Sequence, residues 1–248
     1  MSHHVHVFGL THVGRVRLNN EDEWAAVPDC SFFVLADGMG GHRAGEVASK
    51  EAVQSLCHII QKQASEQKSS ISLQEAEDQL REAIEQTNDR IYKLSHKNTA
   101  CRGMGTTLCC LHFIDSGVVM AHVGDSRIYR LRKERLVQLT KDHSLLRELV
   151  DLGQVEEKQG GENSYKNILT KAVGTESEVE PSIQFQEIFK SDLYLMCSDG
   201  LTDHLSKKEI ESILNKNTDL ETTVKILIAT ANEKGGHDNI TVVLIQVD

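Results

Sequence analysis

Apolar residues recur along the chain with two spacings, which predict strands and helices in a definite order. Runs typical of buried strands cover residues 5–10 and 24–36. From Ala44 to about residue 63, apolar residues recur every three or four positions, as on one face of an amphipathic helix. A second such helix is predicted from about Leu73 to Leu94. Two long helices flanked by strands predict helices packed against sheets.

The rest of the chain is predicted to form mainly short strands. These strands are expected at 106–114, 117–123, 127–132, 136–139, 183–189, 193–198 and 240–247. Helices are expected at about 145–152, 207–214 and 219–233. No repeat or proline-rich linker divides the chain, so we expect a single domain over residues 1–248. Residues 144–171 suit a surface excursion better than a core segment, and Gly160–Ser164 is expected to be mobile.

Composition narrows the classes of function. The chain has 248 residues, long enough for a substantial core, and 39% hydrophobic with 26% charged residues is ordinary for a globular protein. The net charge of −10 (27 − 37) disfavours binding to nucleic acid. No apolar run reaches the roughly 20 residues that span a bilayer, and none of the six cysteines forms a C-x-x-C pair. We therefore expect a cytoplasmic protein with reduced thiols.

Four aspartates each lie beside a glycine or asparagine at the end of an apolar run: Asp37, Asp125, Asp199 and Asp238. If the strands lie side by side, these carboxylates meet at one rim of the fold. Two carboxylates about 4 Å apart repel each other by roughly 4 kcal/mol at an effective dielectric constant near 20. A cation is therefore expected among them, and oxygen ligands favour Mg²⁺ or Mn²⁺. For Asp125 alone, a turn or an ion pair with Arg127 is the alternative.

Residues 14–22 combine two arginines with two acids. The arginine guanidinium has a planar fork that matches phosphate. A solvated turn with local ion pairs is the simpler interpretation of this segment alone. Beside a carboxylate–metal cluster, however, an arginine favours the handling of phosphate esters. In two-metal hydrolysis, ions about 3.5–4 Å apart share a bridging water and stabilise the attacking and leaving oxygens.

Eight motifs, in order from residue 14 to residue 241, resemble those of the metal-dependent PP2C-type (PPM) protein serine/threonine phosphatases, most closely the compact bacterial branch. They are Arg17-x-x-Asn20-Glu21-Asp22, Asp37-Gly38-Met39-Gly40-Gly41-His42, Gly105-Thr106-Thr107, Val123-Gly124-Asp125-Ser126-Arg127, Asp142-His143-Ser144, Leu169-Thr170-Lys171-Ala172-Val173-Gly174, Ser198-Asp199-Gly200-Leu201 and Asp238-Asn239-Ile240-Thr241. The resemblance implies an α+β fold, an αββα sandwich of two antiparallel sheets flanked by helices. It also implies hydrolysis of phosphoserine and phosphothreonine by direct attack of a water that bridges two Mg²⁺ or Mn²⁺ ions.

The resemblance assigns most of the metal ligands. Asp37 would bridge the two ions, and the Gly38 carbonyl would bind one of them. Asp199 and Asp238 would hold the first ion. The expected partners are phosphorylated Ser/Thr proteins, including a partner Ser/Thr kinase, and we expect a monomer.

Further roles follow from the same resemblance. Glu21 or Asp22 would reach the second ion, directly or through water. Asp125, together with Asp199, would offer a weaker third site. Arg17 would grip the substrate phosphate. Residues 144–171 would form a flap beside the site that influences substrate choice and turnover.

The general acid is less well defined. Some family members, notably animal ones, carry a histidine directly after the Asp-Gly pair, where this chain has Met39. His42 is the substitute donor, because its pKa can suit proton transfer near neutral pH. Two alternatives stay open: His42 caps or orients the helix that begins near Ala44, or a metal-bound water protonates the leaving alkoxide. The expected catalytic residues are thus Arg17, Asp37 and His42.

Other chemistries fit the sequence less well. No cysteine has an arginine six residues later, no D-x-D motif is present, and the P-loop signature is absent. These absences disfavour cysteine-based and phospho-aspartyl phosphatases as well as P-loop enzymes. Two alternatives stay open: a catalytically silent phosphoprotein-binding module, and a two-metal nuclease or small-molecule phosphoesterase.

Overall fold

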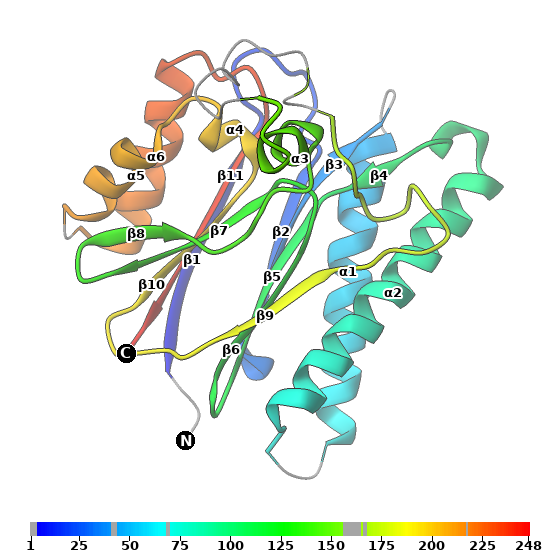
Figure 1. Ribbon diagram of the computed structural model, residues 1–248, viewed down its shortest axis with the longest axis horizontal. Coiled ribbons are helices and arrows are strands. Elements are labelled where there is room, and N and C mark those ends of the chain that lie inside the picture. Colours follow the sequence, from blue (N-terminus) through cyan, green and yellow to red (C-terminus); the bar gives the residue numbers. More distant parts are fainter. Residues whose placement is uncertain (1–3, 41–43, 68–69, 156–164, 166–167, 217) are drawn as a thin grey trace.

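The computed structural model describes residues 4–40, 44–67, 70–155, 165, 168–216 and 218–248. Two β-sheets pack face to face, and helices cover the outer face of each sheet (Figure 1). All strand pairs within the two sheets are antiparallel. The predicted αββα sandwich is therefore confirmed.

The two sheets take their strands from both ends of the chain. The first sheet has the order β1 (Val5–His12), β11 (Ile240–Val247), β10 (Leu193–Cys197), β7 (Arg127–Arg132) and β8 (Arg135–Gln138). The second has the order β2 (Asp22–Val27), β3 (Phe32–Met39), β5 (Leu108–Ile114), β6 (Gly117–Val123) and β9 (Ser182–Gln186), with β4 (Gly105–Thr106) paired to β3. The strand predicted over 24–36 is thus two strands, divided by a 3₁₀ turn at Pro28–Cys30.

The helices divide between the two outer faces (Figure 1). The second sheet is covered by α1 (Ala44–Glu66) and α2 (Leu73–Lys97), and the 3₁₀ turn Thr99–Cys101 follows them. The first sheet is covered by α4 (Asp199–Thr202), α5 (Lys207–Leu214) and α6 (Leu220–Glu233). The short helix α3 (Leu145–Asp151) belongs to the predicted flap. Among the α-helices of the described residues, only the four-residue helix α4 had no counterpart among the predicted helices.

Three apolar layers hold the sandwich together. The layer between the sheets includes Phe33 and Leu111 from the second sheet and Tyr194 and Met196 from the first. One further layer joins each sheet to its own helices. Because both faces of the central strands are buried, a strand such as β6 is buried at every residue, and its sequence is apolar on both faces apart from His122 instead of alternating.

Antiparallel pairing brings the predicted aspartates to one rim. β11 runs opposite to β10, with Cys197 paired to Val242, so Asp238 before β11 lies near Asp199 after β10. In the other sheet, Asp37 of β3 pairs directly with Asp22 of β2. All six cysteines are free thiols, as expected. No helix in the described part of the chain is long and apolar enough to cross a membrane.

Candidate metal centre

A pocket of about 220 Å³ opens at this rim. It is lined by Arg17, Glu21, Asp37, Gly38, Met39, Gly40, Thr107, Asp125, Leu169, Asp199 and Asp238. All the predicted site residues except Asp22 and His42 therefore line one pocket. His42 lies outside the described residues, and Asp22 is buried behind the pocket wall.

Threonines hold the backbone of Asp37. The amide of Asp37 donates to Thr107 Oγ1 at 3.0 Å, and its carbonyl accepts from the Thr107 amide and Thr106 Oγ1, both at 2.8 Å. Thr107 Oγ1 also lies 2.7 Å from Ser126 Oγ, next to Asp125. The two threonines were recognised only as part of a motif, and the structure shows that they fix Asp37 relative to Asp125.

Asp22 occupies a polar niche between the two sheets. Its Oδ2 accepts hydrogen bonds from Ser198 Oγ at 2.8 Å and Thr241 Oγ1 at 2.6 Å. Its Oδ1 has no hydrogen-bond donor among the described residues. Of the two candidates for the second ion, only Glu21 lines the pocket.

The carboxylates destabilise one another's charge. Burial raises the pKa of Asp37 well above its ordinary value, and the charges of neighbouring carboxylates raise it further. The pKa of Asp199 is raised in the same way, first by burial and then by Asp125 and other acids. Burial is also the largest cause that raises the pKa of Asp22 and that of Asp125 to about 6. The cluster therefore carries more negative charge than Arg17, which also lines the pocket, can balance.

The donor atoms fit a hard divalent cation. Asp22 Oδ1 and Asp199 Oδ1 are buried oxygens without a hydrogen-bond donor, which is costly unless a cation or water satisfies them. All the polar groups that converge on the pocket are oxygens apart from Arg17. Within the described ranges, no three His, Cys, Asp or Glu side chains stand as a ready-made ligand set.

Two glycines permit the backbone to pack closely around the aspartates. A Cβ atom on Gly38 would lie 2.0 Å from the carbonyl oxygen of Gly45 in α1, and one on Gly200 would lie 2.0 Å from the carbonyl oxygen of Asn239. Neither glycine has a positive φ, so a left-handed turn does not explain them. Both are required by the close approach of the neighbouring backbone.

Arg17 lies at the pocket mouth on a loop that Asn239 holds in place. Its Nη2 donates to Asp238 Oδ2 at 2.7 Å, and its side chain is half exposed. The buried Asn239 side chain donates to the carbonyls of Val13 (3.0 Å) and Asn19 (2.9 Å), and it accepts from the Glu21 amide at 2.7 Å. No role was predicted for Asn239, although its motif was recognised.

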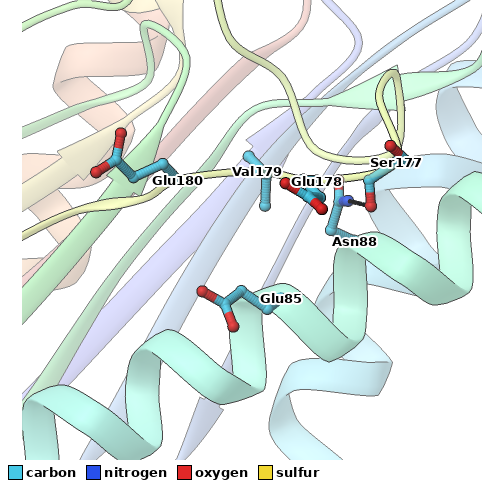
Figure 2. A pocket seen from close by; sticks show the side chains of 6 residues that line it. All are labelled: Glu85, Asn88, Ser177, Glu178, Val179 and Glu180. Carbon is cyan, nitrogen blue, oxygen red and sulfur yellow. Dashed lines mark hydrogen bonds between the residues drawn. The ribbon is translucent and has the colours of Figure 1, made fainter.

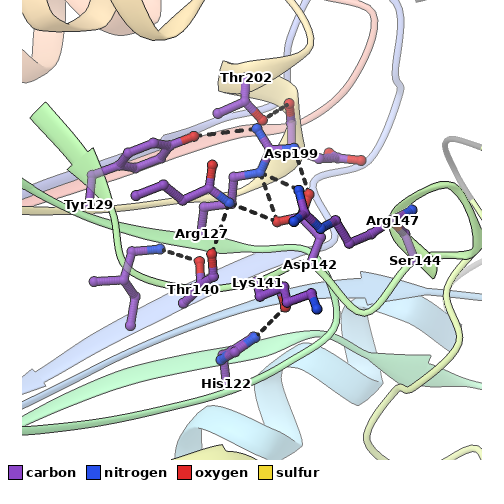
Figure 3. Close-up of polar contacts among 12 residues, drawn as sticks. His122, Arg127, Tyr129, Thr140, Lys141, Asp142, Ser144, Arg147, Asp199 and Thr202 are labelled. Carbon is purple, nitrogen blue, oxygen red and sulfur yellow. Dashed lines mark hydrogen bonds and ion pairs between the residues drawn. The ribbon is translucent and has the colours of Figure 1, made fainter. Parts of the chain in front are cut away.

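Asp125 does not form the ion pair considered as its alternative. Arg127 instead directs Nε and Nη2 at the Asp142 carboxylate, at 3.0 and 2.6 Å (Figure 3). The carbonyl of Asp199 accepts from Thr202 Oγ1 at 3.3 Å in the same group. The charge of Arg127 is thus largely matched by Asp142, and Asp125 faces the pocket.

The base of the flap is built on Asp142-His143-Ser144. His143 Nδ1 accepts from the Gly124 amide at 3.2 Å, and its ring stacks on His122 with 4.5 Å between centroids. Ser144 caps α3 and pairs with Leu169, which lines the pocket. This places both ends of the flap beside the site. The segment predicted to be mobile, Gly160–Ser164, lies outside the described residues.

A larger cavity of about 530 Å³ lies elsewhere, between α2 and the chain after the flap (Figure 2). It is lined by Glu85, Asn88, Ser177, Glu178, Val179 and Glu180. Asn88 donates to the carbonyls of Glu176 and Ser177 and accepts from the Gly174 amide. Asn88 is the buried polar side chain in this lining, and its amide group is occupied in holding the segment after the flap. We therefore assign the cavity no chemistry.

Comparison with known proteins agrees with this geometry. The family description Protein phosphatase 2C matches residues 9–244. The chain belongs to the protein phosphatase 2C family. The serine/threonine phosphatase stp of Listeria monocytogenes is 38% identical to it, over 98% of this chain and 96% of that protein.

Solved structures of the family agree over the whole chain. The serine/threonine phosphatase of S. agalactiae is 37% identical with a TM-score of 0.90, over 99% of this chain and 100% of that one. The catalytic domain of the serine/threonine protein phosphatase PstP, in complex with 2 manganese ions, is 34% identical with a TM-score of 0.86, over 98% of each chain. This protein is accordingly a metal-dependent protein serine/threonine phosphatase of the bacterial type.

Proposed function

We propose that the carboxylates of this pocket hold two divalent ions, Mn²⁺ or Mg²⁺, and position them for phosphoester hydrolysis. Asp37 would contribute to holding both ions, Asp199 and Asp238 would hold the first, and Glu21 with the Gly38 carbonyl would hold the second. Asp125 and Asp199 would offer a weaker third site. The observation that carries the proposal is the convergence of these acids in one pocket with no comparable positive charge.

Waters and backbone complete the coordination in this proposal. No three side chains form a ligand set on their own in the described part of the chain, so the Gly38 carbonyl and bound waters supply the remaining oxygens. Asp22 supports the site from behind, because its Oδ2 is used by Ser198 and Thr241 and only Oδ1 is free to meet a water.

Bound divalent ions supply an activated water and stabilise charge on the phosphoryl oxygens. The protein supplies the orientation. Arg17 uses only Nη2 in its described contacts, with Asp238, which leaves Nε and Nη1 for the substrate phosphate. A fork with one side held by Asp238 presents its remaining donors in a fixed direction, as recognition of a phosphate requires.

Proton transfer to the leaving serine or threonine oxygen is assigned to His42, three residues after Met39. A water in the pocket is the alternative donor. A His42→Gln variant distinguishes them: loss of the alkaline limb of the kcat profile supports His42, and an unchanged profile supports water.

Phosphorylated Ser/Thr proteins are the substrates of this phosphatase, and we include a partner Ser/Thr kinase among them. The six free thiols support action in a reducing compartment, and the cytoplasm is the predicted one. A monomer remains the predicted state.

Hydrolysis of a phosphothreonine peptide tests the proposal directly. We expect activity with Mn²⁺, none with EDTA, and loss of at least about 10³-fold in Asp238→Ala, because a metal ligand is worth several kcal/mol of transition-state stabilisation. Asp248→Ala, at the far end of β11, is the matched control and keeps full activity. Metal-independent hydrolysis, or an active Asp238→Ala, would show that the assignment is wrong.

A further inference from the structure

Three exposed aliphatic side chains surround the mouth of the metal pocket. Leu18 is 97% exposed, Val16 60% and Ile168 45%. Val16 and Leu18 flank Arg17, and Ile168 precedes Leu169. Arg17 and Leu169 both line the pocket. We call these three residues the apolar rim. Singly exposed aliphatic residues are ordinary, but a group of them beside a binding site indicates a contact surface.

The loop that carries Val16 and Leu18 is held rigidly. Asn239 hydrogen-bonds the carbonyls of Val13 and Asn19, on either side of the exposed residues. The Arg15 amide donates to the Gly236 carbonyl at 2.7 Å. These bonds fix the loop backbone in the conformation that exposes Val16 and Leu18. The ordering entropy of the loop is therefore already lost before any partner binds.

The pocket is too small for more than the phosphorylated residue. Its volume is about 220 Å³, and its wall is made largely of carboxylates. Consecutive Cα atoms are only about 3.8 Å apart, so the residues next to the phosphoserine or phosphothreonine must lie over the rim. A charged or strongly hydrated side chain would gain little there, whereas an apolar one would bury area against Val16, Leu18 and Ile168.

We propose that the apolar rim binds an aliphatic or aromatic residue adjacent to the phosphorylated residue, and so selects substrates. The proposed substrates are protein segments in which an apolar side chain lies within two positions of the phosphoserine or phosphothreonine. The inference rests on the proposed function, because it requires the phosphate to reach Arg17 and the carboxylate pocket.

Two phosphothreonine peptides test it, one with leucine and one with serine on both sides of the phosphothreonine. With Mn²⁺ we expect kcat/KM to be about tenfold higher for the leucine peptide, the effect of burying part of one leucine side chain. The double variant Val16→Ser/Leu18→Ser, and separately Ile168→Ser, should reduce this preference. Hydrolysis of an aryl phosphate, which has no flanking residues, should stay unchanged in these variants.

Phe189→Ser is the matched control. Phe189 is also exposed, at 53%, but it precedes β10 at the opposite end of the sheet from the pocket. It should leave the preference intact. Equal kcat/KM for the two peptides, or a preference that survives the rim variants, would overturn the proposal.

A separate binding measurement distinguishes failure of the rim from failure of the proposed function. Phosphonate versions of both peptides cannot be hydrolysed, and their binding in Mn²⁺ is measured by fluorescence anisotropy. Tighter binding of the leucine peptide, lost in the double variant, supports the rim even if the assigned catalytic roles are wrong. Equal binding of the two peptides contradicts the rim, whatever the enzyme hydrolyses.

Discussion

Asp192 lies before β10, and the aspartates of the metal pocket lie at the opposite end of this strand. The charge of Asp192 is matched by an arginine, whereas the pocket aspartates together are not matched. Before β10, Asp192 accepts from Arg132 Nε and Nη2, both at 2.6 Å, and from the Phe189 amide at 2.8 Å. After β10, Asp199 has a buried oxygen with no hydrogen-bond donor among the described residues, and other acids surround it. The same residue type therefore stabilises the fold at one end of the strand and forms the proposed metal site at the other.

The difference lies in how the desolvation of the charge is compensated. A buried carboxylate is costly unless it is paired and hydrogen-bonded. Arg132 and a backbone amide compensate Asp192 within the protein itself. The pocket carboxylates require positive charge from a bound group outside the chain, as the carboxylates of a metal site do. Replacing an aspartate by asparagine should therefore have opposite effects on the stability of the protein at the two ends of β10.

The largest effect is expected for Asp37→Asn. Removing a carboxylate that contacts both proposed ions should lower kcat by at least about 10³-fold, or about 4 kcal/mol. In EDTA the same variant should melt at the same temperature as the wild type or higher, because burial and neighbouring acids penalise the charge of Asp37. A lower melting temperature in EDTA would mean that Asp37 stabilises the fold, contrary to the comparison.

The paired experiment is Asp192→Asn. It should lower stability by about 2–3 kcal/mol, because it leaves the Arg132 guanidinium without its partner. Turnover of an aryl phosphate should stay within about twofold of the wild type at a temperature where both proteins are folded. Chemical denaturation and initial rates measure the two quantities. A large loss of kcat in the folded variant would show that the two ends of β10 are coupled.

The third prediction concerns pH. A carboxylate whose pKa is raised by folding destabilises the protein increasingly as pH rises above its unfolded-state pKa, until the effect levels off above its folded-state pKa. In EDTA, the stability gained by Asp37→Asn should therefore increase between pH 5 and pH 7.5, by about 5 °C in melting temperature. His122, which is buried, and His112 and His143, which are partly buried, have lowered pKa values. The substitution leaves all three in place, so the difference between the two proteins cancels their contribution. A gain that is independent of pH would show that folding does not raise the pKa of Asp37 into this range, because the folded and unfolded states would then bind the same number of protons.

The smallest effect is expected for Thr107→Val. The substitution removes the acceptor of the Asp37 amide and the contact with Ser126 Oγ. A single such hydrogen bond is worth about 1 kcal/mol, so we expect a loss of that order in stability and a several-fold loss in kcat. Thr107→Ser keeps the hydroxyl and serves as the control. If the valine variant keeps the stability and kcat of the wild type while the serine variant loses them, the methyl group and not the hydrogen bond supports Asp37.

The sequence was sufficient for the elements with strong periodicity. The three-to-four spacing after Ala44 and after Leu73 predicted α1 and α2, and apolar runs predicted most strands. The sequence was insufficient where the local spacing of apolar residues does not reveal which element forms. The helix α4 has only four residues and no periodicity to detect, and the strand over 24–36 hid a turn at Pro28–Cys30.

By itself, the sequence determined the family, the alternation of elements and the aspartates at strand ends, because these are local patterns of residue type and spacing. Only the tertiary structure decided which groups meet. It showed that Glu21 and not Asp22 lines the pocket, and that Asn239 holds the Arg17 loop across more than two hundred residues. Such contacts depend on strand pairing and close backbone approach between distant segments, which residue types along a single chain do not encode locally.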